Sequence, residues 1–271
     1  MNANVKNLFS IEGKTALVTG GSRGIGEMIA AGFLDHGAKV YISSRKVEVC
    51  NATARRLSET YGQECICLPA NIAELEGITW LASELAKRES KLDILVNNAG
   101  ATWGAPLDEF PEFGWDKVMD TNVKGIFFLT QKLLPLLRRS ASSEDPARVI
   151  NIGSVDALKT PGFENFSYAA SKAAVHHLTR VLAAHLIKEH IIVNAIAPGP
   201  FPTWMLSSGV GFGGKTEGDG VDWNTVGRRN PSGRVGTMED IAGLTIFLSS
   251  KASAYVVGQT IACDGGAVAV S

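Results

Sequence analysis

Residues 15–26 read TALVTGGSRGIG, an apolar run that passes directly into a glycine-rich turn. The run at 16–18 predicts a buried strand, and the spacing of apolar residues over about 25–34 predicts a helix. Glycines between the two allow a tight turn and the close approach of a pyrophosphate, whose oxygens the first amides of the helix can bind. This order therefore predicts the first strand, turn and helix of a dinucleotide-binding sheet.

The same alternation continues along the rest of the chain. Strands are expected at 40–42, 64–68, 92–96, 148–152, 191–196 and 256–262, with helices at 46–60, 74–88, 115–136, 166–188 and 239–249. Strands that alternate with helices form parallel sheets through right-handed crossovers. About seven strands predict one α/β domain over 1–271, a doubly wound, Rossmann-like parallel sheet with helices on both faces.

One segment, 198–234, interrupts this alternation with prolines, many glycines and little helical periodicity. Long irregular segments within a compact domain are usually functional. We expect a substrate-binding loop or lid here, and the alternative is an inert insertion.

Composition excludes several classes of protein. Of 271 residues, 45% are hydrophobic and 20% charged, which indicates a globular rather than a disordered chain. The 26 basic and 27 acidic residues are interspersed, so no nucleic-acid partner is expected. No apolar run reaches the roughly 20 residues of a membrane span, and the first residues lack a secretory signal. We therefore expect a cytoplasmic protein without membrane contact.

The four cysteines do not predict a disulfide framework in a chain of this length. Cys65 and Cys67 alternate within an expected strand and should point to one face, where packing explains them better than a metal does. The five histidines show no His-Glu-x-x-His pattern, and those on the helix 166–188 are interpreted as packed or solvated. No metal is predicted.

The end of the second strand predicts which nicotinamide cofactor is preferred. An acidic residue there would bind the ribose 2′-hydroxyl, whereas arginine accommodates a 2′-phosphate. This chain has Ser43, Ser44 and Arg45, and Arg23 in the glycine turn adds a second cation. Two guanidinium groups and serine hydroxyls suit a phosphate dianion, which favours NADPH over NADH. The alternative is that both arginines are simply solvated.

Candidate catalytic residues lie at the start of the helix 166–188. Tyr168 and Lys172 are four residues apart, which places the phenol and the ammonium on one helix face. A nearby ammonium favours the phenolate, so we expect the Tyr168 pKa to fall below its usual value of about 10. Ser154, just after an expected strand, is positioned to hold a carbonyl oxygen.

Taken together, these motifs resemble those of the single-domain short-chain dehydrogenase/reductase family over nearly the whole chain. The matching landmarks occur in the family's order: the turn at 19–26, Asn97-Asn98-Ala99-Gly100, Asn122, Ser154, Tyr168 with Lys172, Pro198-Gly199 and Asp264-Gly265-Gly266. Within the family, the stretches NNAGATWG (97–104) and LLPLLRRSASSEDPA (133–147) are most similar to NADPH-dependent 3-oxoacyl-(acyl-carrier-protein) reductases of fatty acid metabolism, those of rhamnolipid synthesis among them.

The resemblance implies a role for each matching residue. Tyr168 is the proton donor in reduction, Lys172 lowers its pKa and holds the nicotinamide ribose, and Ser154 positions the substrate oxygen. Asn122 supports a water in a proton relay. The implied cofactor-binding residues are Gly20, Ser22, Arg23, Gly24, Ile25, Gly26, Ser44, Arg45, Asn71, Ile72, Asn98, Ala99, Gly100, Tyr168, Lys172, Pro198, Gly199 and Phe201.

Two positions depart from the family pattern. Asn71 stands where an aspartate often contacts adenine, and an amide can still donate there. Fourteen residues separate Ser154 from Tyr168 instead of thirteen, so one extra residue lies in the loop beside the substrate. The extra residue therefore bears on which substrate is bound, and the predicted chemistry does not depend on it.

The substrate pocket is the least determined part of the prediction. Candidate lining residues are Ser154, Trp103, Asp156, Phe163, Phe201, Trp204 and Met205. Such walls suit the acyl chain of a 3-oxoacyl thioester, but they also suit a sugar, polyol or cyclic alcohol, and ordinary packing is the alternative for both tryptophans. A catalytically silent NADP-binding subunit is a third hypothesis. The family implies a homotetramer or homodimer that packs the helices 115–136 and 166–188 between subunits.

Overall fold

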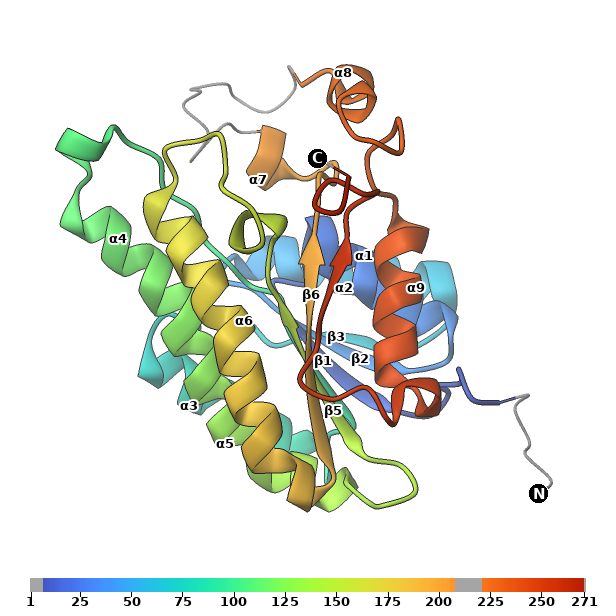
Figure 1. The fold of residues 1–271 in the computed structure, drawn as a ribbon. Helices are drawn as coiled ribbons and strands as arrows, with labels where there is room; N and C mark the ends of the chain where they lie inside the picture. Colours follow the sequence, from blue (N-terminus) through green and yellow to red (C-terminus); the bar gives the residue numbers. More distant parts are fainter. Residues whose placement is uncertain (1–6, 208–220, 271) are drawn as a thin grey trace.

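A single parallel sheet organises the chain in the computed structural model, which describes residues 7–207 and 221–270 (Figure 1). The strands are β1 (Thr15–Thr19), β2 (Lys39–Ser43), β3 (Cys65–Cys67), β4 (Ile94–Asn97), β5 (Ala147–Ile152), β6 (Ile191–Pro198) and β7 (Thr260–Cys263), in the order β3-β2-β1-β4-β5-β6-β7. The chain changes direction across the sheet between β1 and β4. In doubly wound sheets, ligands bind in the crevice at the carboxyl ends of the strands beside such a switch point.

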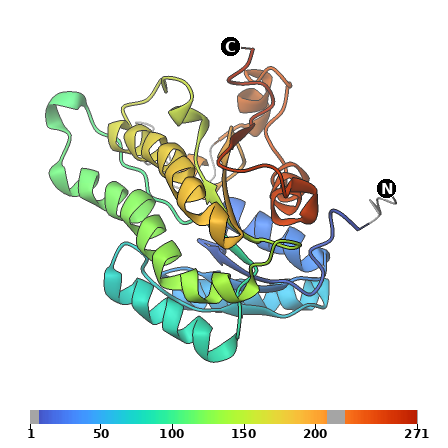
Figure 2. The same ribbon diagram turned by 60° about the horizontal axis from the view of Figure 1, so that its bottom comes forward.

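Helices cover both faces of the sheet, as predicted. They are α1 (Gly24–Asp35), α2 (Val47–Tyr61), α3 (Leu75–Arg88), α4 (Glu112–Met119), α5 (Gly125–Ser140), α6 (Phe166–Leu186), α7 (Trp204–Ser207), α8 (Trp223–Arg228) and α9 (Met238–Ser249). One apolar core lies under α1, α2 and α9, and a second lies under α3, α5 and α6. Figure 2 shows the ribbon of these helices around the sheet. Neighbouring β1 residues Leu17 and Val18 enter opposite cores, as in a parallel strand buried on both faces.

Most boundaries lie within two residues of the sequence expectation, and larger differences occur at three places. The helix expected at 115–136 is α4, a π-helical turn at Asp120–Lys124 and then α5, which also contains Pro135. The last strand begins at Thr260 instead of 256, because Gly258, at φ +69°, turns the chain first. The segment 198–234 contains the short helices α7 and α8, and its residues 208–220 lie outside the described part of the chain.

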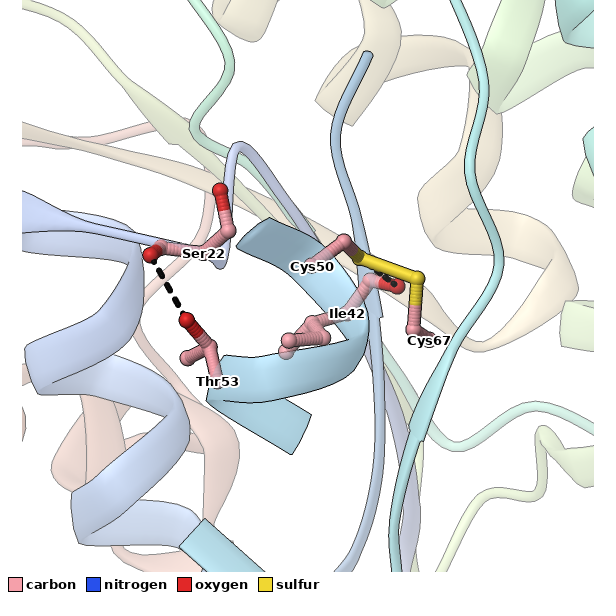
Figure 3. The surroundings of a disulfide bond; sticks show 5 residues. All are labelled: Ser22, Ile42, Cys50, Thr53 and Cys67. Carbon is pink, nitrogen blue, oxygen red and sulfur yellow. Dashed lines mark hydrogen bonds between the residues drawn. A yellow bond between two sulfur atoms is a disulfide. The ribbon is translucent and has the colours of Figure 1, made fainter. Parts of the chain in front are cut away.

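A disulfide between Cys50 and Cys67 joins α2 to β3 (Figure 3). The cysteine pattern did not predict it, because the two residues are 17 positions apart and only the fold brings them together. Cys65 and Cys67 share the core under α1, α2 and α9, as expected, and Cys65 is a free thiol. Among the described residues, no group of three or more His, Cys, Asp or Glu side chains could hold a metal ion.

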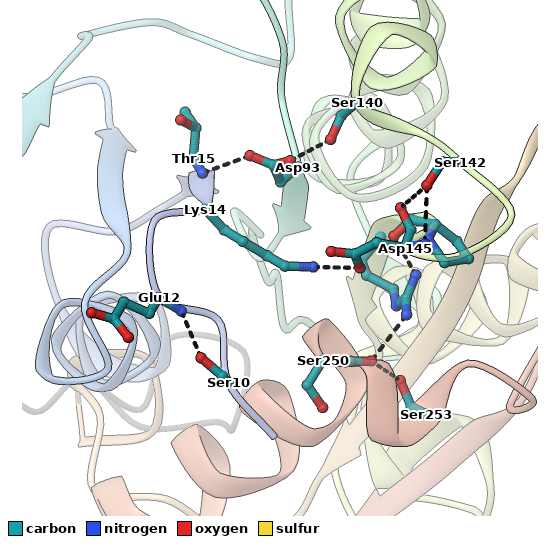
Figure 4. Close-up of polar contacts among 12 residues, drawn as sticks. Ser10, Glu12, Lys14, Thr15, Asp93, Ser140, Ser142, Asp145, Ser250 and Ser253 are labelled. Atoms are coloured by element: carbon teal, nitrogen blue, oxygen red, sulfur yellow. Dashed lines mark hydrogen bonds and ion pairs between the residues drawn. The ribbon is translucent and has the colours of Figure 1, made fainter. Parts of the chain in front are cut away.

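The opposite, amino-terminal edge of the sheet is held by a polar cluster (Figure 4). Asp93 accepts the Thr15 N–H at 2.8 Å, which links the beginnings of β4 and β1. Lys14 and Asp145 form an ion pair at 2.8 Å, and the buried Arg148 guanidinium donates to the Ser250 carbonyl at 2.9 Å. These contacts fix strand register at the edge away from the glycine turn. Within residues 7–207 and 221–270, no helix has the length and apolarity needed to cross a membrane.

Candidate active site

The glycine turn between β1 and α1 has the tight geometry that its sequence predicts. Gly20 and Gly24 adopt φ of +65° and +58°, which side chains disfavour. A Cβ at Gly26 would stand 2.4 Å from the Gly20 carbonyl oxygen, so only glycine permits this approach. Ser22 and Ile25 lie in the same turn, whose amides at the start of α1 can bind phosphate oxygens.

Arg23 and Arg45 are the two cations at the predicted 2′-phosphate position. Burial and then the positive charge of Arg45 lower the Arg23 pKa. The Ser43 and Ser44 hydroxyls are buried without a hydrogen-bond partner among the described residues. Paired cations beside unsatisfied hydroxyls fit an anion, and the residues present therefore fit the 2′-phosphate of NADP.

The loop after β4 links the glycine turn to the catalytic residues. The Asn98 amide donates to the Thr19 carbonyl at 2.8 Å, and the Asn98 and Ala99 N–H groups both donate to the Thr19 hydroxyl at 3.0 Å. A Cβ on Gly100 would lie 3.7 Å from the Lys172 ammonium. Asn98, Ala99 and Gly100 therefore lie between the glycine turn and Lys172.

Two of the predicted cofactor residues, Asn71 and Ile72, are already engaged within the protein. Asn71 accepts the Ala73 N–H at 3.3 Å and donates to the Glu74 carboxylate at 2.7 Å, just before α3. Ile72 is buried in the core under α3, α5 and α6. Of these two residues, Asn71 is half-buried and Ile72 is buried.

The end of β6 presents Pro198 and Gly199 at the carboxyl edge of the sheet, as predicted. A Cβ on Gly199 would meet the Asp264 backbone at 2.8 Å, so this glycine allows β6 and the segment after β7 to touch. Phe201 is different, because its ring is buried in the core and lies against Gly236. The structure thus places Pro198 and Gly199 at the carboxyl end of β6 and the Phe201 ring in the core under α1, α2 and α9.

The four predicted catalytic residues meet at the carboxyl ends of β4 and β5. Tyr168 and Lys172 face each other in α6, with the ammonium 5.5 Å from the phenol ring centre. Lys172 is buried and donates to the Ile152 carbonyl at 2.8 Å. Asn122, in the π-helical turn, donates to the Ser171 hydroxyl at 2.9 Å and exchanges two hydrogen bonds with the Ala101 backbone.

The Tyr168 pKa differs in direction from the sequence expectation. Burial raises it to about 12, although a hydrogen bond with Ser154 lowers it, and the charge of Asp156 raises it further. Burial also lowers the Lys172 pKa to about 8. The expected fall was wrong because desolvation of the phenolate raises the pKa more than the hydrogen bond with Ser154 lowers it. A phenol that stays protonated near neutral pH is suited to donate a proton.

The predicted substrate residues occupy different surroundings. Asp156, half-buried, accepts the Asn165 amide at 3.3 Å beside the catalytic cluster. Trp103 packs edge-on against Phe113 of α4, with ring centres 4.9 Å apart, as in ordinary packing. Trp204 covers the Arg23 guanidinium at 4.3 Å, so it lies beside the glycine turn, and Met205 follows it in α7. Phe163 is about half exposed in the loop before α6.

His176 was interpreted as an ordinary packed or solvated histidine, but its ring accepts the Ser154 N–H at 3.4 Å. The only available signal was its position four residues after Lys172, on the same helix face. That spacing alone does not reveal contact with a backbone group from another element.

A doubly wound sheet, a glycine turn at the start of α1 and a Ser–Tyr–Lys cluster are typical of a dinucleotide-dependent oxidoreductase. The sequence profile of the family described as enoyl-(acyl carrier protein) reductase matches residues 20–268. The chain belongs to the short-chain dehydrogenase/reductase family.

Relatives within the family include two proteins of different described activity. The rhamnolipids biosynthesis 3-oxoacyl-(acyl-carrier-protein) reductase of Pseudomonas aeruginosa is 49% identical over 95% of this chain and 97% of its own. The gluconate 5-dehydrogenase of Gluconobacter oxydans is 34% identical over 96% of each. Among solved structures, the Pseudomonas aeruginosa RhlG/NADP active-site complex has a TM-score of 0.88 and 48% identity, covering 97% of this chain and 99% of that one.

Proposed function

We propose that the protein is an NADPH-dependent reductase that converts the 3-oxo group of an acyl thioester to a secondary alcohol. One observation carries this proposal: Ser154, Tyr168 and Lys172 lie together, with the Lys172 ammonium 5.5 Å from the Tyr168 ring centre, and burial raises the pKa of the phenol. A protonated phenol is the form that a reductase needs. A catalytically silent subunit would not need this set of side chains.

Each residue of the cluster has a role in this reaction. Tyr168 donates its proton to the carbonyl oxygen, and the Ser154 hydroxyl holds that oxygen in place. Lys172 holds the nicotinamide ribose, and Asn122 supports a water that returns the proton to Tyr168. NADPH supplies the hydride when it is bound.

The cofactor preference rests on the paired arginines. A 2′-phosphate between Arg23 and Arg45 would relieve their repulsion and provide an acceptor for the Ser44 hydroxyl. The solved relative that contains NADP supports this assignment. The segment 198–234 is proposed to be a substrate-binding loop or lid. Of its described residues, Thr203 and Trp204 lie beside the turn at Gly24 and Arg23.

The choice of an acyl thioester is supported by the 49%-identical relative, described as a 3-oxoacyl-(acyl-carrier-protein) reductase. A second candidate, a dehydrogenase of a sugar acid or polyol, is supported by the gluconate 5-dehydrogenase. A reductase that consumes NADPH and acyl thioesters acts where both are made, so we place it in the cytoplasm and in fatty acid metabolism.

The loss of NADPH absorbance tests the substrate class directly. We expect turnover with acetoacetyl thioesters and little oxidation of gluconate or polyols with NADP⁺. Efficient gluconate oxidation without thioester reduction would favour the second candidate instead. Tight NADPH binding with no turnover of thioesters, cyclic ketones or sugars would indicate the silent subunit.

We also propose that the protein is a homotetramer or a homodimer. Trp115 of α4 and Phe127 of α5 are exposed apolar side chains, and Phe127 lines a groove of about 330 Å³ with Met119, Val123 and Leu178. Exposed apolar grooves of this kind suit a second copy of the chain. Light scattering at assay concentration measures the assembly.

A further inference from the structure

The buried imidazole of His176 lies against the backbone that carries the catalytic serine. His176 is one helical turn beyond Lys172 in α6 and is 4% exposed. Its Nε2 accepts the Ser154 N–H at 3.4 Å. The preceding residue is held separately, because the Gly153 N–H donates to the Ile196 carbonyl at 2.7 Å.

A glycine at position 153 is what allows the imidazole to approach. A Cβ on Gly153 would stand 2.0 Å from Nε2 of His176, far inside van der Waals contact. The backbone of Gly153 does not have a positive φ, so an alanine there would be excluded by the imidazole rather than by its own conformation. Gly153 and His176 therefore form one interlocked unit.

The charge state of His176 suits an acceptor. Burial, together with the positive charges of Lys172 and Arg180, lowers its pKa to about 4, so the ring is neutral near neutral pH. A neutral imidazole can accept the Ser154 N–H through Nε2, whereas an imidazolium cannot. Without this acceptor, the buried Ser154 N–H would lose its partner.

We propose that His176 is a positioning residue, whose Nε2 holds the Ser154 backbone so that the serine hydroxyl meets the carbonyl oxygen protonated by Tyr168. The inference rests on the proposed reductase function. On the other side, the Ser154 hydroxyl accepts the Asp156 N–H at 3.1 Å, so the residue is fixed from both directions. Displacements of about 1 Å in such groups can reduce turnover by on the order of 100-fold.

Substitution of His176 separates positioning from packing. In His176→Gln the amide oxygen reaches the position of Nε2, whereas His176→Leu fills space without an acceptor. We expect His176→Leu to lower kcat by on the order of 10- to 100-fold with the dissociation constant for NADPH unchanged, and His176→Gln to retain most activity. His177→Leu, at the exposed neighbouring residue, is the matched control. Full activity of folded His176→Leu, or equal loss in the Gln and Leu variants, would overturn the proposal.

A double-mutant cycle tests the interlock. Gly153→Ala should lower kcat in the wild-type protein, because the new methyl group displaces the imidazole. In a His176→Ala background the same change should have little further effect, since the obstructing ring is gone. Equal effects of Gly153→Ala in both backgrounds would show that the two residues act independently.

Hydrogen exchange at the Ser154 amide gives a readout that needs no turnover. His176→Leu should speed this exchange relative to wild type and His176→Gln, while the amides of β5 keep their protection. Unchanged exchange would refute the positioning role even if activity fell. An inactive wild-type protein would refute the proposed function, and the exchange rates would still decide the role of His176.

Discussion

At the scale of single residues, solvation decides how the catalytic pair behaves. The spacing of Tyr168 and Lys172 correctly predicts that they face each other, but it cannot show that Lys172 is buried and Tyr168 partly buried. Burial raises one pKa and lowers the other, while the Lys172 ammonium donates to the Ile152 carbonyl. In the proposed reaction, a raised pKa suits Tyr168 to donate a proton, and the reverse reaction would need a more alkaline pH to ionise it.

Removal of the phenolic hydroxyl tests this role. We expect Tyr168→Phe to lower kcat for carbonyl reduction by about 10²- to 10⁴-fold, the range typical of a lost general acid. NADPH binding, measured by fluorescence titration, should change little because the ring remains. A parallel loss of binding and turnover would assign the tyrosine a structural role.

The arginine pair makes a separate prediction about cofactor choice. Arg45→Asp replaces a phosphate partner with a repelling charge, so the preference for NADPH over NADH should fall by on the order of 10-fold or more. The exposed Arg55→Asp, on the outer face of α2, provides the same charge change away from the turn. An unaltered ratio of the two kcat/KM values in Arg45→Asp would remove Arg45 from the cofactor site.

Titration of His176 links the site to stability. Its pKa is lowered from 6.5 to about 4 in the folded protein, so the unfolded chain binds more protons between these values. The unfolding free energy is therefore unaffected by this titration above pH 6.5, where the ring is neutral in both states. It falls as the pH falls to about 4, because only the unfolded chain gains a proton. Urea unfolding of His176→Gln should show a smaller loss of unfolding free energy across this window, by about 2–3 kcal/mol. Identical pH profiles for the two proteins would contradict the lowered pKa.

At the scale of elements, the helix that carries Asn122 shows a limit of sequence periodicity. A π-helical turn of five residues lies between two ordinary helices, so the apolar spacing reads as one continuous helix. Such turns are frequent at functional sites. Here the turn carries the buried Asn122 between the loop after β4 and α6.

The link between α2 and β3 is another feature that only the fold reveals. Thr53 of α2 donates to the Ser22 carbonyl at 3.1 Å, so the helix that the Cys50–Cys67 disulfide ties down also supports the glycine turn (Figure 3). Cross-linking a short loop stabilises a protein mainly by restricting the unfolded chain.

Removal of one cysteine sulfur measures how much the disulfide contributes to the unfolding free energy. Without reductant, Cys67→Ser should lower the unfolding free energy by about 3 kcal/mol, and dithiothreitol should abolish most of the difference. Cys263→Ser, at a free cysteine, is the control. Titration of all four thiols in denatured, unreduced protein would show that the disulfide had not formed.

At the scale of the whole molecule, the parallel sheet explains why so much of the site could be predicted. Because carboxyl ends of parallel strands share one edge, motifs that follow β1, β2, β4, β5 and β6 necessarily gather there. Contacts between loops and helices are not encoded in this way. The sequence therefore missed the approach of His176 to Ser154, the cover of Trp204 over Arg23 and the burial of Phe201.

A crystal structure of the protein with NADPH bound tests most directly the claim that one crevice joins the arginine pair to the proton donor. We expect the 2′-phosphate between Arg23 and Arg45, the pyrophosphate at the start of α1, and the nicotinamide C4 beside the Tyr168 hydroxyl with room for a carbonyl group. A nicotinamide ring directed away from Tyr168, or a 2′-phosphate distant from both arginines, would contradict the account.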